Sequence, residues 1–136
     1  MENILSKQRI GHIALIVDDY DDAITFYTQK LHFTLIEDIV LSAAKRWVLV
    51  APEGSQEFCL LLAKADNEEQ QTRIGNQTGG RVFSFLYTNN FETDYQNLLD
   101  HGITIVRKPV VEAYGTVAVF ADLYGNLWDL IEPTKK

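Results

Sequence analysis

Residues 10–33, IGHIALIVDDYDDAITFYTQKLHF, predict a strand, an acidic turn and an amphipathic helix. The run from Ile10 to Val17 is almost wholly apolar, which is typical of a strand buried on both faces, and His12 is its one ionisable residue. The aspartates that follow are suited to cap a helix and to interact with the positive end of its dipole. One helical face is expected to pack onto the core through Ile24, Tyr27, Thr28 and Leu31. An ionisable imidazole is unusual in an apolar, buried strand, so His12 is a candidate functional residue.

The same order of elements occurs again in residues 82–103, VFSFLYTNNFETDYQNLLDHGI. The strands align at an offset of 70, which pairs His12 with Val82, and the helices align at an offset of 71, which pairs Ile24 with Tyr95. The identity between the copies is low, but element order, spacing and turn position agree together. The chain is therefore predicted to contain a structural repeat.

Composition excludes several classes of protein. The 136 residues are 46% hydrophobic and 23% charged, which is ordinary for a globular domain. A net charge of −7 with no basic stripe argues against a nucleic-acid partner. No apolar run approaches the roughly 18 residues of a membrane span, and we expect no signal peptide because the first residues have neither a long apolar core nor a small-residue cleavage site. The single cysteine, Cys59, cannot form an internal disulfide, so we expect a cytoplasmic protein.

Turn residues divide the remainder of the chain. Strands are expected at residues 33–41, 46–50, 58–62, 82–87, 103–106, 116–121 and 127–131, with a second helix over 91–101. Pro109 is expected to interrupt the strand that begins at Ile103. We predict a single domain over 1–136, with module one at about 8–64, a polar linker at 65–80 and module two at about 81–133.

The ends of the chain resemble a known superfamily. The segments GHIALIVDDYDDAITFYTQKLHF (11–33) and GTVAVFADLYGNLWDLIEP (115–133) are similar to the vicinal oxygen chelate superfamily, which contains the glyoxalases, the fosfomycin and bleomycin resistance proteins and the extradiol dioxygenases. The turn DLYGNLWDL resembles the superfamily's Asp-Pro-Asp-Gly-Asn-x-x-Glu-Leu. The resemblance implies an α+β fold in which two βαβββ modules form a cupped mixed sheet around a central cavity, and it implies a homodimer.

The resemblance also implies a metal site. Members of the superfamily often hold one divalent metal, such as zinc, nickel, manganese or iron, on up to four strand positions. Those positions fall on His12, Asp129, Cys59 and Val82 in this chain. Val82 cannot be a ligand, and a one-step change of register would replace Cys59 by Glu57. In the alternative interpretation, His12 and Asp129 pair with each other and bind no metal.

The cavity is expected to be centred between His12 and Asp129. Arg46, Trp47 and Tyr114 are candidate ligand-binding residues, as is Val82, and an arginine would favour a carboxylate or phosphate. For each of the first three, a purely structural role is the alternative.

Two functions follow from the resemblance. One is a metal-dependent lyase or isomerase of the glyoxalase type, in which the metal polarises oxygens of a small substrate. The other is a metal-free protein that binds and sequesters a small molecule in the same cavity. A structural or partner-binding module is a third alternative.

Overall fold

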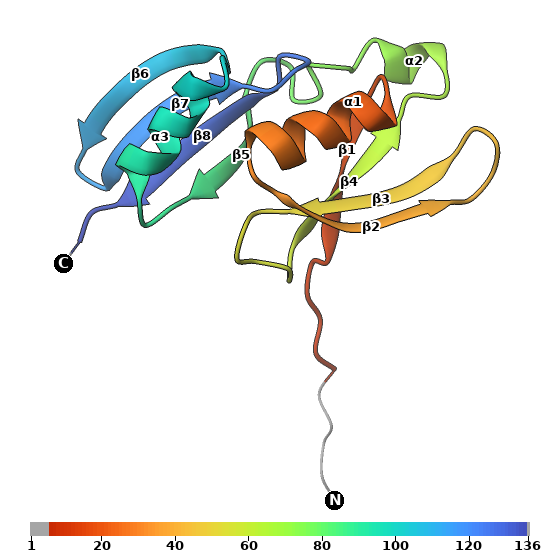
Figure 1. The fold of residues 1–136 in the computed structure, drawn as a ribbon, viewed down its shortest axis with the longest axis horizontal. Helices are drawn as coiled ribbons and strands as arrows, with labels where there is room; N and C mark the ends of the chain where they lie inside the picture. The colour runs from red at the N-terminus through yellow and green to blue at the C-terminus, as the bar shows by residue number, and fades with distance from the viewer. Residues whose placement is uncertain (1–5, 136) are drawn as a thin grey trace, which may run out of the picture.

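The computed structural model of the protein describes residues 6–135. It confirms an α+β fold built from two βαβββ modules (Figure 1). The first module consists of β1 (His12–Val17), α1 (Tyr20–Thr25), η1 (Phe26–Lys30), β2 (Thr34–Val40), β3 (Arg46–Ala51) and β4 (Cys59–Lys64). A short helix, α2 (Glu68–Gln71), follows. The second module consists of β5 (Val82–Tyr87), α3 (Phe91–Asp100), β6 (Ile105–Glu112), β7 (Gly115–Ala121) and β8 (Leu127–Pro133).

The repeat predicted from the sequence is confirmed by the element bounds. Sheet A has the strand order β1-β4-β3-β2, and sheet B has the equivalent order β5-β8-β7-β6. In each sheet the first and last strands of the module are parallel and the other neighbours are antiparallel. His12 and Val82 begin β1 and β5, at the offset predicted for the strands, and Tyr20 and Phe91 begin α1 and α3, at the offset predicted for the helices.

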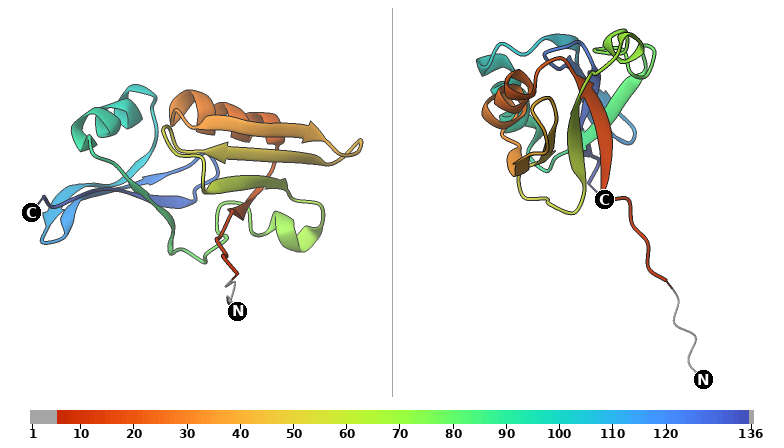
Figure 2. Two further views of the ribbon diagram at one scale, coloured as in Figure 1. Left: turned by 90° about the horizontal axis from the view of Figure 1, so that it is seen from below. Right: turned by 90° about the vertical axis from the view of Figure 1, so that its right-hand side faces the viewer.

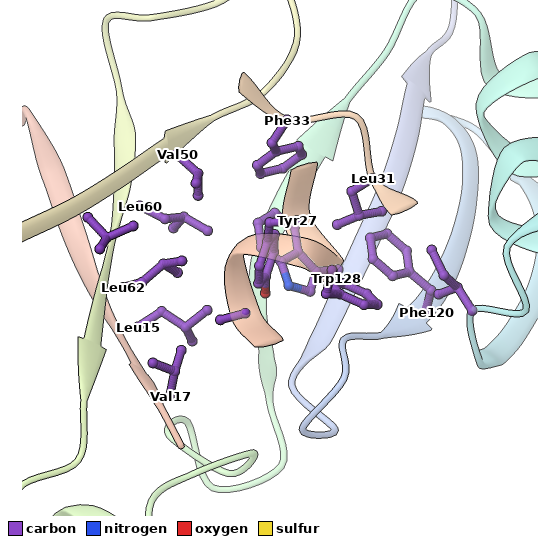
Figure 3. Packing of buried hydrophobic residues seen from close by; sticks show 14 of the residues in the cluster. Leu15, Val17, Tyr27, Leu31, Phe33, Val50, Leu60, Leu62, Phe120 and Trp128 are labelled. Carbon is purple, nitrogen blue, oxygen red and sulfur yellow. The ribbon is translucent and has the colours of Figure 1, made fainter. Parts of the chain in front are cut away.

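The two sheets share one hydrophobic core. The segment formed by α1 and η1 packs between them, and Tyr27, which is fully buried, lies at its centre (Figure 3). On one side of Tyr27 are Leu15 and Leu62 of sheet A, and on the other are Phe120 and Trp128 of sheet B. The Tyr27 and Trp128 ring centroids are 6.0 Å apart. A hydrogen bond also joins η1 to α3. The Asn97 side chain of α3 donates to the carbonyl of Lys30, at the C-terminal end of η1, at 2.8 Å.

The shared core covers only one face of each sheet, so the prediction that β1 is buried on both faces is wrong. Leu15 and Val17 point into the core, whereas His12 and Ala14 are exposed. In the right-hand view of Figure 2, α1 lies on one side of β1 and β4. The apolar run is long because one face is buried in this chain and the opposite face is also largely apolar.

The first helix also differs from the prediction. It changes to a π-helix at Phe26, so each residue beyond this point is rotated relative to a regular α-helix. Tyr27 and Leu31 of the predicted face are buried, but Ile24 and Thr28 are only partly buried, and Phe26 joins the core.

Strand β6 continues through Pro109, where the sequence predicted an interruption. Proline is tolerated because β6 is an edge strand and its pairing with β7 shifts register on both sides of Arg107. Of the helices described in residues 6–135, none is long and apolar enough to cross a membrane.

The linker between the modules packs along the free edge of β1. The Gln77 side chain accepts a hydrogen bond from the Ile16 amide at 2.9 Å and donates one to the Ala14 carbonyl at 2.8 Å. One side-chain amide thus performs the role of a neighbouring strand. Nearby, Gly75 lies so close to the backbone of Tyr124 that a Cβ atom at this position would clash with the carbonyl oxygen.

Candidate functional site

The sheet faces opposite the shared core are the candidate functional surfaces. Residues that pair directly across neighbouring strands point to the same side of a sheet. We call the side of sheet A that carries His12, Ala14, Trp47, Leu49, Cys59 and Leu61 the A face, and the side of sheet B that carries Phe85, Tyr87, Arg107, Val110, Val119 and Asp129 the B face. Each combines a mostly apolar surface with a few ionisable groups.

The A face brings His12, Cys59 and Trp47 together. His12 is the register partner of Cys59, and its ring packs edge-on against Trp47 with centroids 5.5 Å apart. Cys59 is 5% exposed, and its thiol donates a hydrogen bond of 3.7 Å to the Gln56 carbonyl. These contacts give the face an aromatic centre beside a small apolar cluster that also contains Leu49 and Ile36.

The B face carries Asp129 and Arg107 in the same row, with Val119 between them. Register pairing aligns Arg107, Val119, Asp129 and Phe85 in one row across four strands. Burial raises the pKa of Asp129 above its ordinary value, and the positive charge of Arg107 lowers it by a smaller amount. Phe85 is 56% exposed and Tyr87 is 64% exposed, so large aromatic surface flanks the charged pair.

Arg46 lies on the opposite side of sheet A from His12. Its guanidinium donates to Asp38 at 2.6 Å and to Asp21 at 2.9 Å, and these hydrogen bonds raise its pKa. Val48, two residues further along β3, and Tyr20, whose ring lies under the guanidinium, belong to the shared core and mark this side of the sheet. Arg46 is therefore engaged in ion pairs within the chain.

The remaining predicted residues lie at the margins. Tyr114 is 61% exposed in the hairpin between β6 and β7. Val82 begins β5 beside Leu127, on the B face. Glu57 precedes β4 in an exposed loop, and its carbonyl accepts a hydrogen bond of 2.7 Å from Arg9.

Within one chain, the shared core separates His12 and Cys59 from Asp129. Residues 6–135 contain no group of three or more histidine, cysteine, aspartate or glutamate side chains that could hold a metal. Two clefts of about 280 and 170 Å³ at the module junction include none of these three residues. One chain alone therefore brings His12 and Cys59 together but leaves Asp129 apart from them.

Arg107 is a candidate site residue that the sequence pattern did not indicate. Its position on the B face depends on an extra residue in β6, because Ile105 pairs with Phe120 and Arg107 with the adjacent Val119. The only signal in the sequence is Pro109, since proline within a strand often marks a bulge.

Comparison with known proteins agrees with the fold. The sequence model of the Glyoxalase/Bleomycin resistance protein/Dioxygenase superfamily matches residues 9–130. The chain belongs to this superfamily. Its resemblance to the vicinal oxygen chelate proteins is thereby confirmed, and the two βαβββ modules are the fold expected of such a member.

Several known proteins are similar to almost the full length of the chain. An uncharacterised protein of Shewanella frigidimarina is 56% identical and the match covers 96% of this chain and 97% of the relative. The crystal structure of UcmS2 has a TM-score of 0.81 at 31% identity, with 93% and 98% of the two chains covered. TnmS3, an antibiotic binding protein from Streptomyces sp. CB03234, has a TM-score of 0.75 at 23% identity, with 96% and 99% covered, a likeness of fold.

Proposed function

We propose that the protein binds and sequesters a small, largely apolar molecule in a chamber formed by two copies of the chain. In this chamber the A face of one copy lies opposite the B face of the other. The observation that carries the proposal is that both helix-free faces are largely apolar and carry aromatic side chains that are half-buried or exposed in the single chain, Trp47 on the A face and Phe85 and Tyr87 on the B face.

Side chains on both faces support a ligand of this kind. The A face offers Trp47 and the exposed Ile39, and the B face offers Phe85, Tyr87 and Val110. Aromatic side chains bury much apolar area and stack on flat molecules, whereas the polar groups that are present can fix an orientation. Burying these side chains against a ligand would remove a large apolar area from water.

A homodimer would place a second wall opposite each of the two faces. Within a chain the two faces are separated by the core around Tyr27, so neither has an opposite wall. A twofold axis between two copies would create two equivalent chambers, each with one A face and one B face. The edge strands β2 and β6 also offer unpaired backbone groups that a second copy could cover.

The comparisons are compatible with binding of a small molecule. TnmS3 has this fold and is an antibiotic binding protein. For this chain we propose capture of a ligand rather than a chemical step, because the two faces that would line the chamber are mostly apolar.

The donor set does not fit a metal site within one chain. His12 and Cys59 are neighbours, but the thiol is buried against a carbonyl and Asp129 lies beyond the core. A chamber formed by two copies would add the carboxylate of Asp129 to the imidazole of His12. A metal-dependent lyase or isomerase is therefore the second candidate, and it requires the dimer.

The proposal is tested with purified, untagged protein. Sedimentation is expected to give twice the 15.5 kDa chain mass at micromolar concentration, and the neutral fluorophore N-phenyl-1-naphthylamine is expected to bind with one site per chain. A monomer that binds no fluorophore would contradict the proposal.

Elemental analysis separates the two candidates. Stoichiometric zinc, nickel, manganese or iron in the parent and none in His12→Ala would favour the enzyme. Absence of metal from both proteins after incubation with these ions would favour the sequestering protein.

A further inference from the structure

We propose that Arg107 is the residue that selects the ligand, and that the ligand carries an anionic group on a flat apolar body. The inference rests on the proposed binding function and adds the chemical class of the molecule bound.

Two register shifts isolate Arg107 within β6. Ile105 pairs with Phe120, Arg107 pairs with Val119, and Val110 pairs with Val117. Each step uses one residue more on β6 than on β7, so there is a bulge on either side of Arg107. In a regular strand, Arg107 would share the core-facing side with Ile105. The first bulge reverses this and turns the guanidinium onto the B face.

The guanidinium of Arg107 has donors available for a ligand. Among residues 6–135, no hydrogen bond or ion pair within 4 Å engages its side chain, whereas Arg46 has two acidic partners. The acidic group in its row is Asp129, which lies two strands away on β8, with Val119 of β7 between them. The side chain is exposed and is flanked by Val119 and Val110, so an anion bound there would be partly shielded from water.

The chemistry of this position specifies the ligand. A guanidinium binds a carboxylate, sulfonate or phosphate through two parallel hydrogen bonds. Phe85 lies in the same row, on the other side of Asp129, and offers an exposed aromatic surface for the ligand's body. A molecule that is flat and apolar with one anionic group uses both features.

The first module gives the A face the opposite charge at the equivalent place. Glu37 and Arg107 are related by the offset of 70 residues that also relates β1 to β5. Like Arg107, Glu37 directly follows a register shift in its strand. Glu37 pairs with Leu49 and so lies on the A face. The bulge is thus present in both modules, but only the B face presents an arginine there. The anionic end of the ligand is therefore assigned to the B face.

Two fluorophores with the same aromatic body test the inference. 8-Anilino-1-naphthalenesulfonate carries a sulfonate, and N-phenyl-1-naphthylamine does not. The parent protein is expected to bind the sulfonate more tightly than the neutral compound, and added salt is expected to weaken only the sulfonate. Arg107→Gln is expected to reduce the sulfonate affinity about tenfold and to leave the neutral compound within about twofold, as for loss of one charge-assisted pair.

Lys108→Gln is the matched control, because it removes an equal charge from the neighbouring position of the same strand. It is expected to leave both affinities unchanged. Equal loss of sulfonate binding in Lys108→Gln and Arg107→Gln, or no loss in either, would overturn the assignment of Arg107 while leaving the binding chamber intact. Failure of the parent to bind either fluorophore would instead overturn the proposed function. Retained affinity for the neutral compound in Arg107→Gln reports that the variant is folded.

Discussion

At the scale of single residues, the chain contains one aromatic side chain on which both modules depend. Trp128 contacts the rings of Tyr27, Phe33, Phe83 and Phe120, with centroids 5.8 to 6.0 Å away. Its indole nitrogen is buried without a hydrogen-bond partner among the described residues. The ring contacts of Trp128 therefore outweigh the cost of burying its indole N–H without a hydrogen-bond partner.

Replacing Trp128 separates these two effects. Trp128→Ala is expected to lower the free energy of unfolding by about 3–5 kcal/mol because it leaves a large cavity. Trp128→Phe is expected to cost clearly less, because most ring contacts remain and the unsatisfied N–H is removed. Urea denaturation measures both, and equal losses in the two variants would contradict this explanation.

Asp129 predicts a pH-dependent effect on stability. Its pKa is raised in the folded chain, so folding favours the neutral carboxyl group, and the contribution is lost as the pH rises through the raised pKa. Asp129→Asn is therefore expected to raise the thermal midpoint at about pH 7 and to leave it unchanged at about pH 3, where the carboxyl group is largely neutral in both states. A lower midpoint at neutral pH would show that the charge of Arg107 outweighs burial.

At the scale of secondary-structure elements, the edge of β1 depends on the linker. Gln77 forms both hydrogen bonds that a neighbouring strand would otherwise supply to Ala14 and Ile16. The adjacent turn is held by the close approach of Gly75 to Tyr124. The polar linker therefore has a structural function as well as connecting the modules.

Removing the Gln77 side chain tests this function. Gln77→Ala is expected to destabilise the protein by about 1–2 kcal/mol, the usual contribution of one part-buried and one exposed hydrogen bond. The Ile16 amide should also exchange faster with solvent, because it loses its acceptor. Gln71→Ala, an exposed position on α2, is the control and should change neither quantity. Unchanged exchange at Ile16 in Gln77→Ala would contradict the edge-capping role.

The order of the elements within the two modules could be predicted from the sequence, but the short helix α2 in the linker, the bulges and the π-helix could not. Strand alternation predicted that His12 shares a face with Ala14 and that Asp129 shares one with Ile131, and the register agrees. A regular period cannot show an inserted residue, because the insertion is stabilised by contacts with the neighbouring strand. For this reason Arg107, whose face depends on a bulge, was missed.

At the scale of the whole molecule, the packing of α1 between the sheets determines which surfaces remain exposed. Ile24 and Tyr27 fit the amphipathic pattern, but the pattern does not reveal that the helix packs against both sheets. Their partners on sheet B are distant in sequence, so only the folded chain shows that His12 and Asp129 lie on opposite sides of one core. The proposed chamber therefore requires two chains.

Mixing two damaged chains tests this arrangement. Trp47→Glu introduces a charge on the A face and Phe85→Glu introduces one on the B face, so each homodimer has two damaged chambers and is expected to bind no N-phenyl-1-naphthylamine. In a heterodimer purified through two different tags, one chamber receives both substitutions and the other receives neither. The heterodimer should therefore bind one fluorophore per dimer with the parent affinity. If each chamber were formed within a single chain, every chamber would contain one damaged wall, and the heterodimer would bind none. Fluorescence titration of the purified heterodimer against both homodimers measures the difference.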